Sequence, residues 1–300
     1  MNAVKTTFSI KDLESLGGVK AHTIRIWEKR YNLLEPQRTP TNIRTYTLAD
    51  LQKLLNVRFL LDNNYKISKV AKHDSKAIAA MVADLVARKN AEITSHAINS
   101  LKIAMMNFDQ ELFQATYDAL REDLSFQEVF IQAFIPLLHE IGLLWQTDTI
   151  NPAHEHFIYN LIKQKIVLQT EKVQQQVGTQ KKTTFVLFLP ENEIHELGLI
   201  YLNYELIAKG YKTIYLGQSI QLESLEYLSL NHPEIAFVSY FTVKPEPDEL
   251  PEYLETFNTT FKKFTHQLHV LGYRVQELNA TKTPKNVQVH KKIEDFIQTL

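Results

Sequence analysis

Residues 183–199 read TTFVLFLPENEIHELGL, a short apolar run followed directly by a polar loop and the start of a helical pattern. The run is rich in β-branched and aromatic residues and is too short for a helix, so it predicts a buried β-strand. Similar runs recur toward the C-terminus, with helical patterns between them. They are KTIYLG, EIAFVSYF, QLHVLGY and, before a last helix at 291–300, NVQVH. This alternation predicts a parallel sheet with helices on both faces.

The loop after this strand carries three residues that together can hold a metal-containing ligand. Glu193, His195 and Gly198 are spaced as Glu-x-His-x-x-Gly. In an open α/β sheet, ligands bind beyond the carboxyl ends of the strands. A histidine there can ligate a metal through one ring nitrogen while a carboxylate orients the other nitrogen. A glycine at the start of the following helix lets a large ligand approach the backbone closely.

Residues 76–178 are almost free of Gly and Pro and predict a bundle of four or five helices. Apolar residues recur there at helical spacing in the segments 78–86, 98–106, 112–120, 129–145 and 157–173. Near the end of this bundle, Trp145 is followed after nine residues by Glu155 and His156. We expect the loop between them to face a cleft between bundle and sheet. The simpler alternative is a tryptophan in the bundle core and two polar residues on a helix surface.

The N-terminal segment 8–34, FSIKDLESLGGVKAHTIRIWEKRYNLL, predicts two short helices around a Gly-Gly turn. The apolar stripe of the second helix, Ile24, Trp27 and Tyr31, is expected to face the core and to leave basic side chains outside. Two such helices form a helix-turn-helix whose basic second helix can enter a major groove of DNA.

A second feature of this head is the segment PQRTPTNIRTYT at 36–47, which predicts a β-hairpin wing. Two helix starts nearby carry the capping-box pattern, in which a hydroxyl residue is followed three positions later by an acidic residue. The pairs are Ser9 with Asp12 and Thr47 with Asp50. Both pairs predict where a helix of the head begins.

Charge separates the head from the rest of the chain. Residues 1–72 carry 13 Lys and Arg against 6 Asp and Glu, whereas the remainder carries 20 against 28. A basic head on an acidic body is expected of a DNA-binding domain attached to a sensor domain.

Cysteine is absent, which excludes disulfides and thiolate-bound metals. We see neither a secretion signal nor a membrane span, so we expect a cytoplasmic protein without a membrane partner.

The head resembles the DNA-binding domain of MerR-type transcriptional regulators. The resemblance rests on TIRIWEKRY at 23–31, on Pro-x-Arg-Thr at 36–39 and on Arg-x-Tyr-Thr at 44–47. It implies a homo-oligomer on double-stranded promoter DNA that carries an inverted repeat. The candidate DNA contacts are Lys20, His22, Thr23, Arg25, Arg30, Arg38, Thr39, Arg44 and Tyr46.

The body resembles cobalamin-binding domains, in which the histidine of the Glu-x-His-x-x-Gly pattern becomes the lower ligand of cobalt. The Trp-x9-Glu-His pattern is similar to that of MerR-type regulators with adenosylcobalamin domains, the CarH and LitR photoreceptors. The resemblance implies a winged helix-turn-helix head (1–75), a helical cap (76–178) and a Rossmann-like domain (179–300). By this resemblance His195 would ligate cobalt. The other cofactor contacts would be Trp145, Glu155, His156, Glu193, Gly198, Ser239 and Gly272.

The chain departs from the family pattern at three places. The family's Ser-x-Leu is Ser-Tyr-Phe at 239–241, and its Gly-Gly is Leu271-Gly272, where the leucine would fill the slot for the nucleotide tail of the cofactor. The histidine that follows the tryptophan in light-sensing members is Gln146, a poor cobalt ligand.

Three functions stay open at this point. The first is a regulator that senses adenosylcobalamin, with or without light, through a change of oligomer such as dimer to tetramer. The second is a regulator whose cobalamin-like domain has lost the cofactor and answers to a protein partner or another small molecule. The third, a corrinoid enzyme or methyl carrier, is disfavoured by the basic head. Because phosphate-loop, dinucleotide and nucleophile-elbow patterns are lacking, we expect no enzyme.

Overall fold

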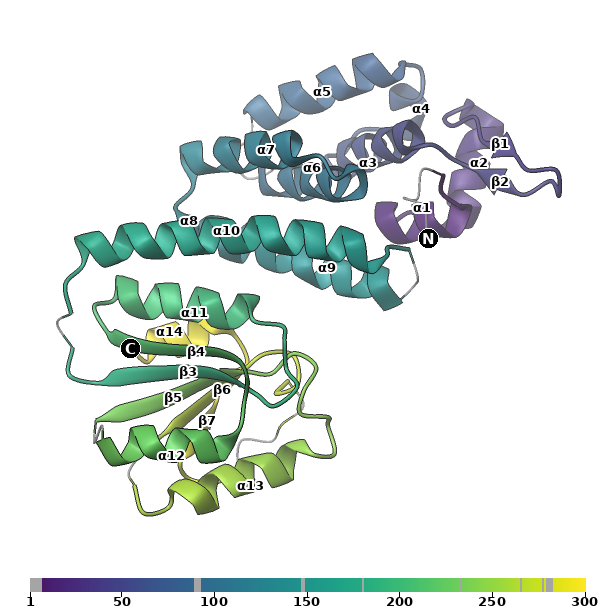
Figure 1. Ribbon diagram of the computed structural model, residues 1–300. Helices are drawn as coiled ribbons and strands as arrows, with labels where there is room; N and C mark the ends of the chain where they lie inside the picture. Colours follow the sequence, from purple (N-terminus) through teal and green to yellow (C-terminus); the bar gives the residue numbers. More distant parts are fainter. Residues whose placement is uncertain are drawn as a thin grey trace. The chain divides into compact units, whose positions relative to one another are not determined.

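The computed structural model describes residues 7–88, 93–146, 149–179, 181–231, 234–264, 266–276, 278 and 283–300. They form two compact units that divide between Leu161 and Ile162 (Figure 1). The three domains expected from the sequence, with boundaries at 75 and 178, stay a prediction. Among the described residues, none of the helices combines the length and apolar character that crossing a membrane requires.

The head at the start of the first unit is a helix-turn-helix with a short wing. Its elements are α1 (Ile10–Gly17), α2 (Ala21–Tyr31), β1 (Gln37–Arg38), β2 (Arg44–Thr45), α3 (Leu48–Asp62) and α4 (Ile67–Val70). Both predicted capping boxes are present, at the starts of α1 and α3. Gly18 follows α1 with φ +65°, a left-handed conformation that glycine adopts without steric cost. The wing is antiparallel, with Arg38 opposite Arg44.

One expectation about the head was wrong. Of the three residues predicted to face the core from α2, only Ile24 is buried, while Trp27 and Tyr31 are half-buried. The reason is that α2 packs mainly against the short helix α1, which is too small to cover its whole apolar stripe. Part of the cover comes instead from Arg30, whose guanidinium lies 5.4 Å from the centre of the Tyr31 ring.

The predicted helical segment is a run of helices around an aromatic core. Its elements are α5 (Ser75–Arg88), α6 (Ile93–Asn107), α7 (Gln110–Asp123), α8 (Phe126–Val129), a π-helical turn η2 (Phe130–Phe134), α9 (Ile135–Gln146) and α10 (Pro152–Gln176). The rings of Phe113 and Tyr117 stack on Phe134 at 6.2 and 6.1 Å. The division between the two units falls within α10.

A buried lysine connects three helices of the first unit. Lys102 lies on α6, and its ammonium nitrogen is 2.7 Å from a carboxylate oxygen of Glu140 on α9. The same nitrogen donates to the backbone carbonyl of Leu16, 3.3 Å away in the last turn of α1. The head is therefore tied to two helices of the bundle through one charged group.

The second unit contains the predicted parallel sheet, which confirms the α/β fold class. Its strands are β3 (Thr184–Pro190), β4 (Lys212–Ile220), β5 (Ile235–Tyr240), β6 (Leu268–Leu271) and β7 (Val287–Val289). All pair in parallel, in the order β4-β3-β5-β6-β7. The helices are α11 (Leu197–Ala208), α12 (Leu222–Asn231), α13 (Leu250–Phe261) and α14 (Ile293–Gln298). Figure 1 shows α11 and α14 on one face of the sheet and α12 and α13 on the other.

The strand order places a switch point at β3. The chain leaves β3 for β4 on one side and then returns past β3 to β5 on the other side. The loops that follow β3 and β5 therefore diverge at the carboxyl edge of the sheet, which is where ligands bind in folds of this kind. Alternation along β5 turns Phe237 toward α13, since its ring is 5.6 Å from Phe257, and turns Tyr240 toward α11.

Candidate functional site

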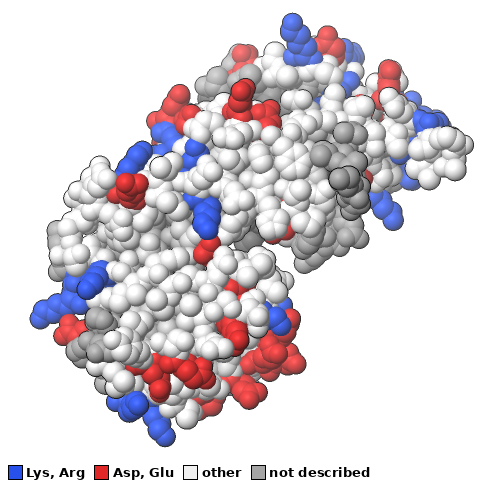
Figure 2. Space-filling view, viewed as in Figure 1, with Lys and Arg blue, Asp and Glu red and all other residues white. Residues whose placement is uncertain are grey.

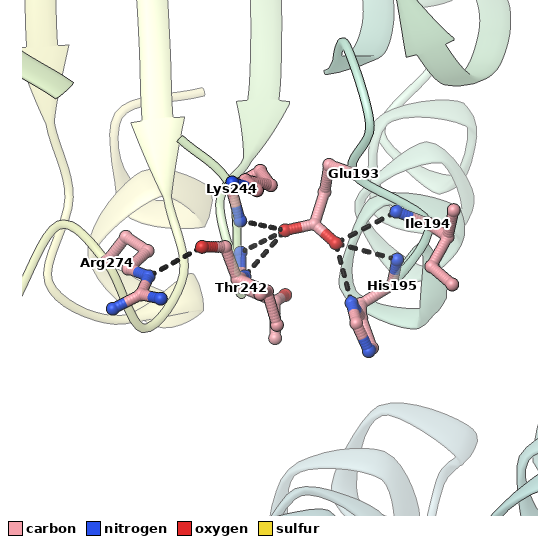
Figure 3. A network of polar contacts seen from close by, with 7 residues as sticks. Glu193, Ile194, His195, Thr242, Lys244 and Arg274 are labelled. Carbon is pink, nitrogen blue, oxygen red and sulfur yellow. Dashed lines mark hydrogen bonds and ion pairs between the residues drawn. The ribbon is translucent and has the colours of Figure 1, made fainter. Parts of the chain in front are cut away.

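A single carboxylate joins the two loops at the switch point (Figure 3). Glu193 is fully buried. One of its oxygens accepts backbone N–H bonds from Ile194 and His195, both at 2.9 Å. The other accepts from the backbone of residues 242, 243 and 244, at 3.1, 2.6 and 2.8 Å. Figure 3 shows the carboxylate between the two loops. Arg274 donates to the backbone carbonyl of Val243 at 2.7 Å.

These contacts decide the charge of Glu193. Burial on its own would raise the pKa of this carboxyl group, but hydrogen bonds from the His195 ring and from the two loops outweigh burial and lower the pKa to about 2. The carboxylate is thus negatively charged throughout the physiological pH range. Five backbone donors and one imidazole donor surround it, which leaves its charge well compensated although it is buried.

His195 is oriented by this carboxylate. Its Nδ1 atom lies 2.6 Å from the Glu193 Oε1 atom, and 39% of its side chain is exposed. The contact assigns the proton of the neutral ring to Nδ1 and makes Nε2 the nitrogen that can act as a metal ligand. Glu193 therefore orients the His195 ring so that Nε2 is available to a metal, as the spacing of the two residues predicts.

A further acidic residue of this loop was not predicted. Glu196 is buried, and its carboxylate accepts from Lys163 on α10 at 2.5 Å and from the hydroxyl of Tyr215 on β4 at 2.9 Å. It holds the start of α11 against two neighbouring elements. Its partners are distant in the sequence, so no local pattern could have revealed this role.

Three small residues expected to contact the cofactor, Gly198, Ser239 and Gly272, are in contact with other residues of the same domain. A Cβ atom on Gly198 would lie 2.6–2.7 Å from three ring atoms of Tyr240. A Cβ on Gly272, where φ is +106°, would lie 2.4 Å from the carbonyl oxygen of Phe241. Ser239 is buried and donates to the carbonyl of Phe188 at 2.8 Å.

The expectation that Leu271 fills the slot for the nucleotide tail stays a prediction, and the structure adds a second bulky residue near it. Leu271 is buried on β6, but the ring against Gly198 belongs to Tyr240, its pairing partner on β5. The tyrosine reaches the glycine because β5 is the direct neighbour of β3, the strand that leads into α11. The last residue of β5 points to the face of the sheet that α11 covers.

The residues expected on the other side of the cofactor lie at the ends of α9 and α10. Trp145 and Gln146 are in the last turn of α9, and their side chains lie outside the described part of the chain. Glu155 is half-buried and His156 is exposed in the first turns of α10. The predicted cleft that they would share with the sheet stays a prediction.

The head presents basic side chains on α2 and the wing. Figure 2 shows Lys and Arg around the head, and Asp and Glu gathered over α12 and α13. The exposed members of the predicted DNA-contact set are Lys20, His22, Arg25, Arg30 and Arg38. Thr23 and Thr39 are half-buried, and Thr39 closes the wing turn through bonds with the backbone of Ile43.

Two members of that set are held by a glutamate that sequence reasoning missed. Glu28 on α2 accepts from Arg44 Nε at 3.2 Å and from the Tyr46 hydroxyl at 2.5 Å. Tyr46 is 1% exposed, and burial together with Glu28 raises the pKa of its hydroxyl. The wing is therefore fixed to α2, and Tyr46 supports it from inside. An acidic residue within the basic run RIWEKR is the only sequence signal of this role.

Comparison with known protein families identifies two segments of the chain. Residues 8–76 match the MerR HTH family of regulatory proteins. Residues 97–168 match the B12 binding domain family, and this segment corresponds to the helices from α6 into α10.

Individual proteins match larger parts of the chain. It is 29% identical to the HTH-type transcriptional repressor CarH of Myxococcus xanthus over 223 residues. These residues cover 73% of this chain and 73% of CarH. It is 21% identical over 263 residues to the repressor CarA of the same organism, 83% of this chain and 81% of that one. The monomethylamine corrinoid protein of Methanosarcina barkeri shares the fold, with a TM-score of 0.58 and 12% identity over 70% of this chain and 98% of its own.

Proposed function

We propose that the chain is a DNA-binding transcriptional regulator that senses an adenosyl corrinoid, because residues 8–76 match the MerR HTH family and residues 97–168 match the B12 binding domain family. The observation that carries this proposal is the pair of Glu193 and His195, a metal-binding arrangement at the switch point of a sheet that follows a basic helix-turn-helix. Repression by CarH and CarA, the similar proteins, favours the same role here.

The head binds double-stranded promoter DNA in this proposal. Arg25 and Arg30 are exposed on α2 and would face the major groove, while Arg38 on the wing would bind phosphate. His22 and Thr23, whose side chains are 3.3 Å apart, are the candidates for base edges. Two copies of the chain would read the two halves of an inverted repeat.

His195 is the residue that would bind the corrinoid. When bound, the corrinoid would supply a cobalt ion that takes an imidazole nitrogen as a ligand. Glu193 would hold the ring at Nδ1 and increase the basicity of Nε2. This part of the site fits the cofactor. The part that would take a nucleotide tail does not fit, because the Tyr240 ring lies against Gly198.

The family resemblance, rather than any contact in the structure, assigns Trp145, Glu155 and His156 to the adenosyl group. In this proposal the bound corrinoid favours one oligomer, dimer or tetramer, and the oligomer sets the affinity for DNA. Gln146 stands where light-sensing relatives carry histidine, so a stable adduct after illumination is not part of the proposal.

The test measures whether the purified protein retains a bound corrinoid. The purified chain is incubated in the dark with adenosylcobalamin or adenosylcobinamide and desalted, and its absorbance is recorded. We expect retained corrin bands that His195→Ala abolishes, and a change of oligomer on gel filtration. Binding to a selected inverted-repeat duplex should change with the corrinoid. Equal DNA affinity with and without bound corrinoid would contradict the coupling.

A second candidate function has support from one observation. The closed packing at Gly198 and Gly272 favours a regulator that works without a corrinoid and answers to a protein partner or another small molecule. A protein that stays colourless with both corrinoids and still binds DNA would favour this candidate.

A further inference from the structure

Gly198 has a close neighbour within its own chain. Its φ angle lies outside the left-handed region that requires glycine, so backbone conformation does not explain the residue. What excludes a side chain is the Tyr240 ring, because an added Cβ would lie 2.6 Å from its Cε1 and Cζ atoms. The space that a glycine opens at the start of α11 is thus occupied by an aromatic side chain from β5.

The place of Tyr240 follows from the sheet, and its side chain is half-buried there. It is the last residue of β5, where its backbone pairs with Leu271 of β6. Burial raises the pKa of its hydroxyl to about 12, and Glu294 on α14 contributes to the rise. The ring therefore lies on the sheet face that α11 and α14 cover (Figure 1). A ligand that displaced this ring would have to replace the contacts that the ring makes with its neighbours.

The glycine at the end of β6 offers no alternative opening. A Cβ on Gly272 would lie within 2.8 Å of three backbone atoms of Phe241. Backbone atoms cannot move aside as a flexible side chain can. Gly272, which the family resemblance places beside the nucleotide tail, is therefore covered by Phe241, and Gly198 at the start of α11 is covered by Tyr240.

We propose that Tyr240 is the specificity residue of this site and excludes the nucleotide tail, so that the chain accepts corrinoids without a tail, the cobinamide class. This inference rests on the proposed binding of cobalt by His195. A corrin ring held by His195 would use the exposed edge of the sheet, where that side chain is 39% exposed, whereas a tail that entered beside the start of α11 would need the space that the Tyr240 ring takes beside Gly198. A steric block of this kind discriminates between ligands that share their other contacts.

The experiment compares two corrinoids on two proteins. Cobinamide and hydroxocobalamin are titrated into the full chain and into Tyr240→Ala, and binding is followed by corrin absorbance, which reports the axial ligand, and by calorimetry. We expect Tyr240→Ala to increase the affinity for cobalamin about tenfold or more and to leave the affinity for cobinamide within about threefold. Comparing the two proteins removes the intrinsic difference between the ligands.

Two further variants serve as a replacement for Tyr240→Ala and as a control. Tyr240→Val, which places a smaller residue of high β-propensity at the end of β5, replaces the alanine variant if that one does not fold. Tyr211→Ala removes a half-buried tyrosine at the opposite end of the sheet, where its hydroxyl donates to Leu300, and should leave both affinities unchanged.

The outcomes separate this inference from the proposed function. If the unaltered chain binds cobalamin through His195 and Tyr240→Ala does not improve the affinity, the inference on Tyr240 is overturned and corrinoid binding stands. If neither corrinoid binds to either protein, both are overturned.

Discussion

Glu28 in the head and Glu193 in the sheet domain each hold two elements together, but their partners differ. Glu193 accepts five backbone N–H bonds as well as the His195 ring, and it is fully buried. Glu28 accepts only from side chains in the contacts described, those of Arg44 and Tyr46. Backbone donors cannot turn away without unfolding a loop, whereas side-chain donors can change rotamer. The sheet loops are therefore fixed. In the wing, DNA can compete for the half-buried Arg44, whereas Tyr46 is buried and stays with Glu28.

The largest expected effect comes from Glu193→Gln. The amide keeps the size of the side chain but cannot accept at both ends, so several buried N–H groups lose their acceptor. We expect the free energy of unfolding to fall by about 3 kcal/mol or more, measured by urea denaturation. Glu191→Gln, two residues earlier and exposed, is the control and should change stability by less than about 0.5 kcal/mol. Equal effects of the two substitutions would contradict the role of Glu193.

Glu28→Ala should weaken the wing by less. The buried hydroxyl of Tyr46 loses its acceptor, at a cost of about 2 kcal/mol in stability. If Glu28 positions the wing, DNA affinity falls about tenfold, although removing a negative charge would by itself strengthen binding to DNA. Fluorescence anisotropy distinguishes these opposite signs. Glu35→Ala, which removes an exposed acidic residue bonded to Asn32, is the matched control for charge.

The contribution of Glu193 depends on pH with a defined sign. Its pKa is about 2 in the folded protein, below the ordinary value of 4.5, so its ionisation stabilises the fold at neutral pH. The stabilisation is nearly complete above about pH 5, and about 1 kcal/mol or more is lost by pH 3.5. The stability difference between the unaltered protein and Glu193→Gln should shrink by this amount when urea denaturation is repeated at both pH values. A constant difference would show that Glu193 is not ionised in this way.

Arg25→Ala should have the smallest effect. Loss of one exposed cation from α2 should weaken DNA binding by about 1 kcal/mol and reduce the slope of log affinity against log salt by about 1. The control is Arg58→Ala, since this exposed arginine of α3 is already 2.7 Å from Asp62. A similar loss for Arg58 would show that general charge, rather than the face of α2, governs binding.

Elements whose signal is local were predictable from the sequence. The strands of the sheet are short apolar runs, and the starts of α1 and α3 carry their capping residues within three positions. The pairing of Glu193 with His195 was predictable for the same reason, because the two residues are two positions apart.

Contacts between distant segments were not predictable in this way. Tyr240 fills the space beside Gly198 although the two residues are 42 positions apart in the sequence, and the sequence drew attention to Leu271 instead. Glu28 meets Arg44 only after the wing folds back onto α2. Such pairs depend on which strands become neighbours, and a single sequence contains no record of that.

The contact of Lys102 with Leu16 has a consequence for modularity. The MerR match ends at residue 76 and the B12-binding match begins at residue 97, which suggests two segments that could be exchanged independently. Lys102 belongs to the second segment, yet it places a positive charge on the carbonyl end of α1 in the first segment. A chimera that grafts this head onto another sensor would lose that charge. A working graft must therefore carry α6 and Glu140 of α9 with the head.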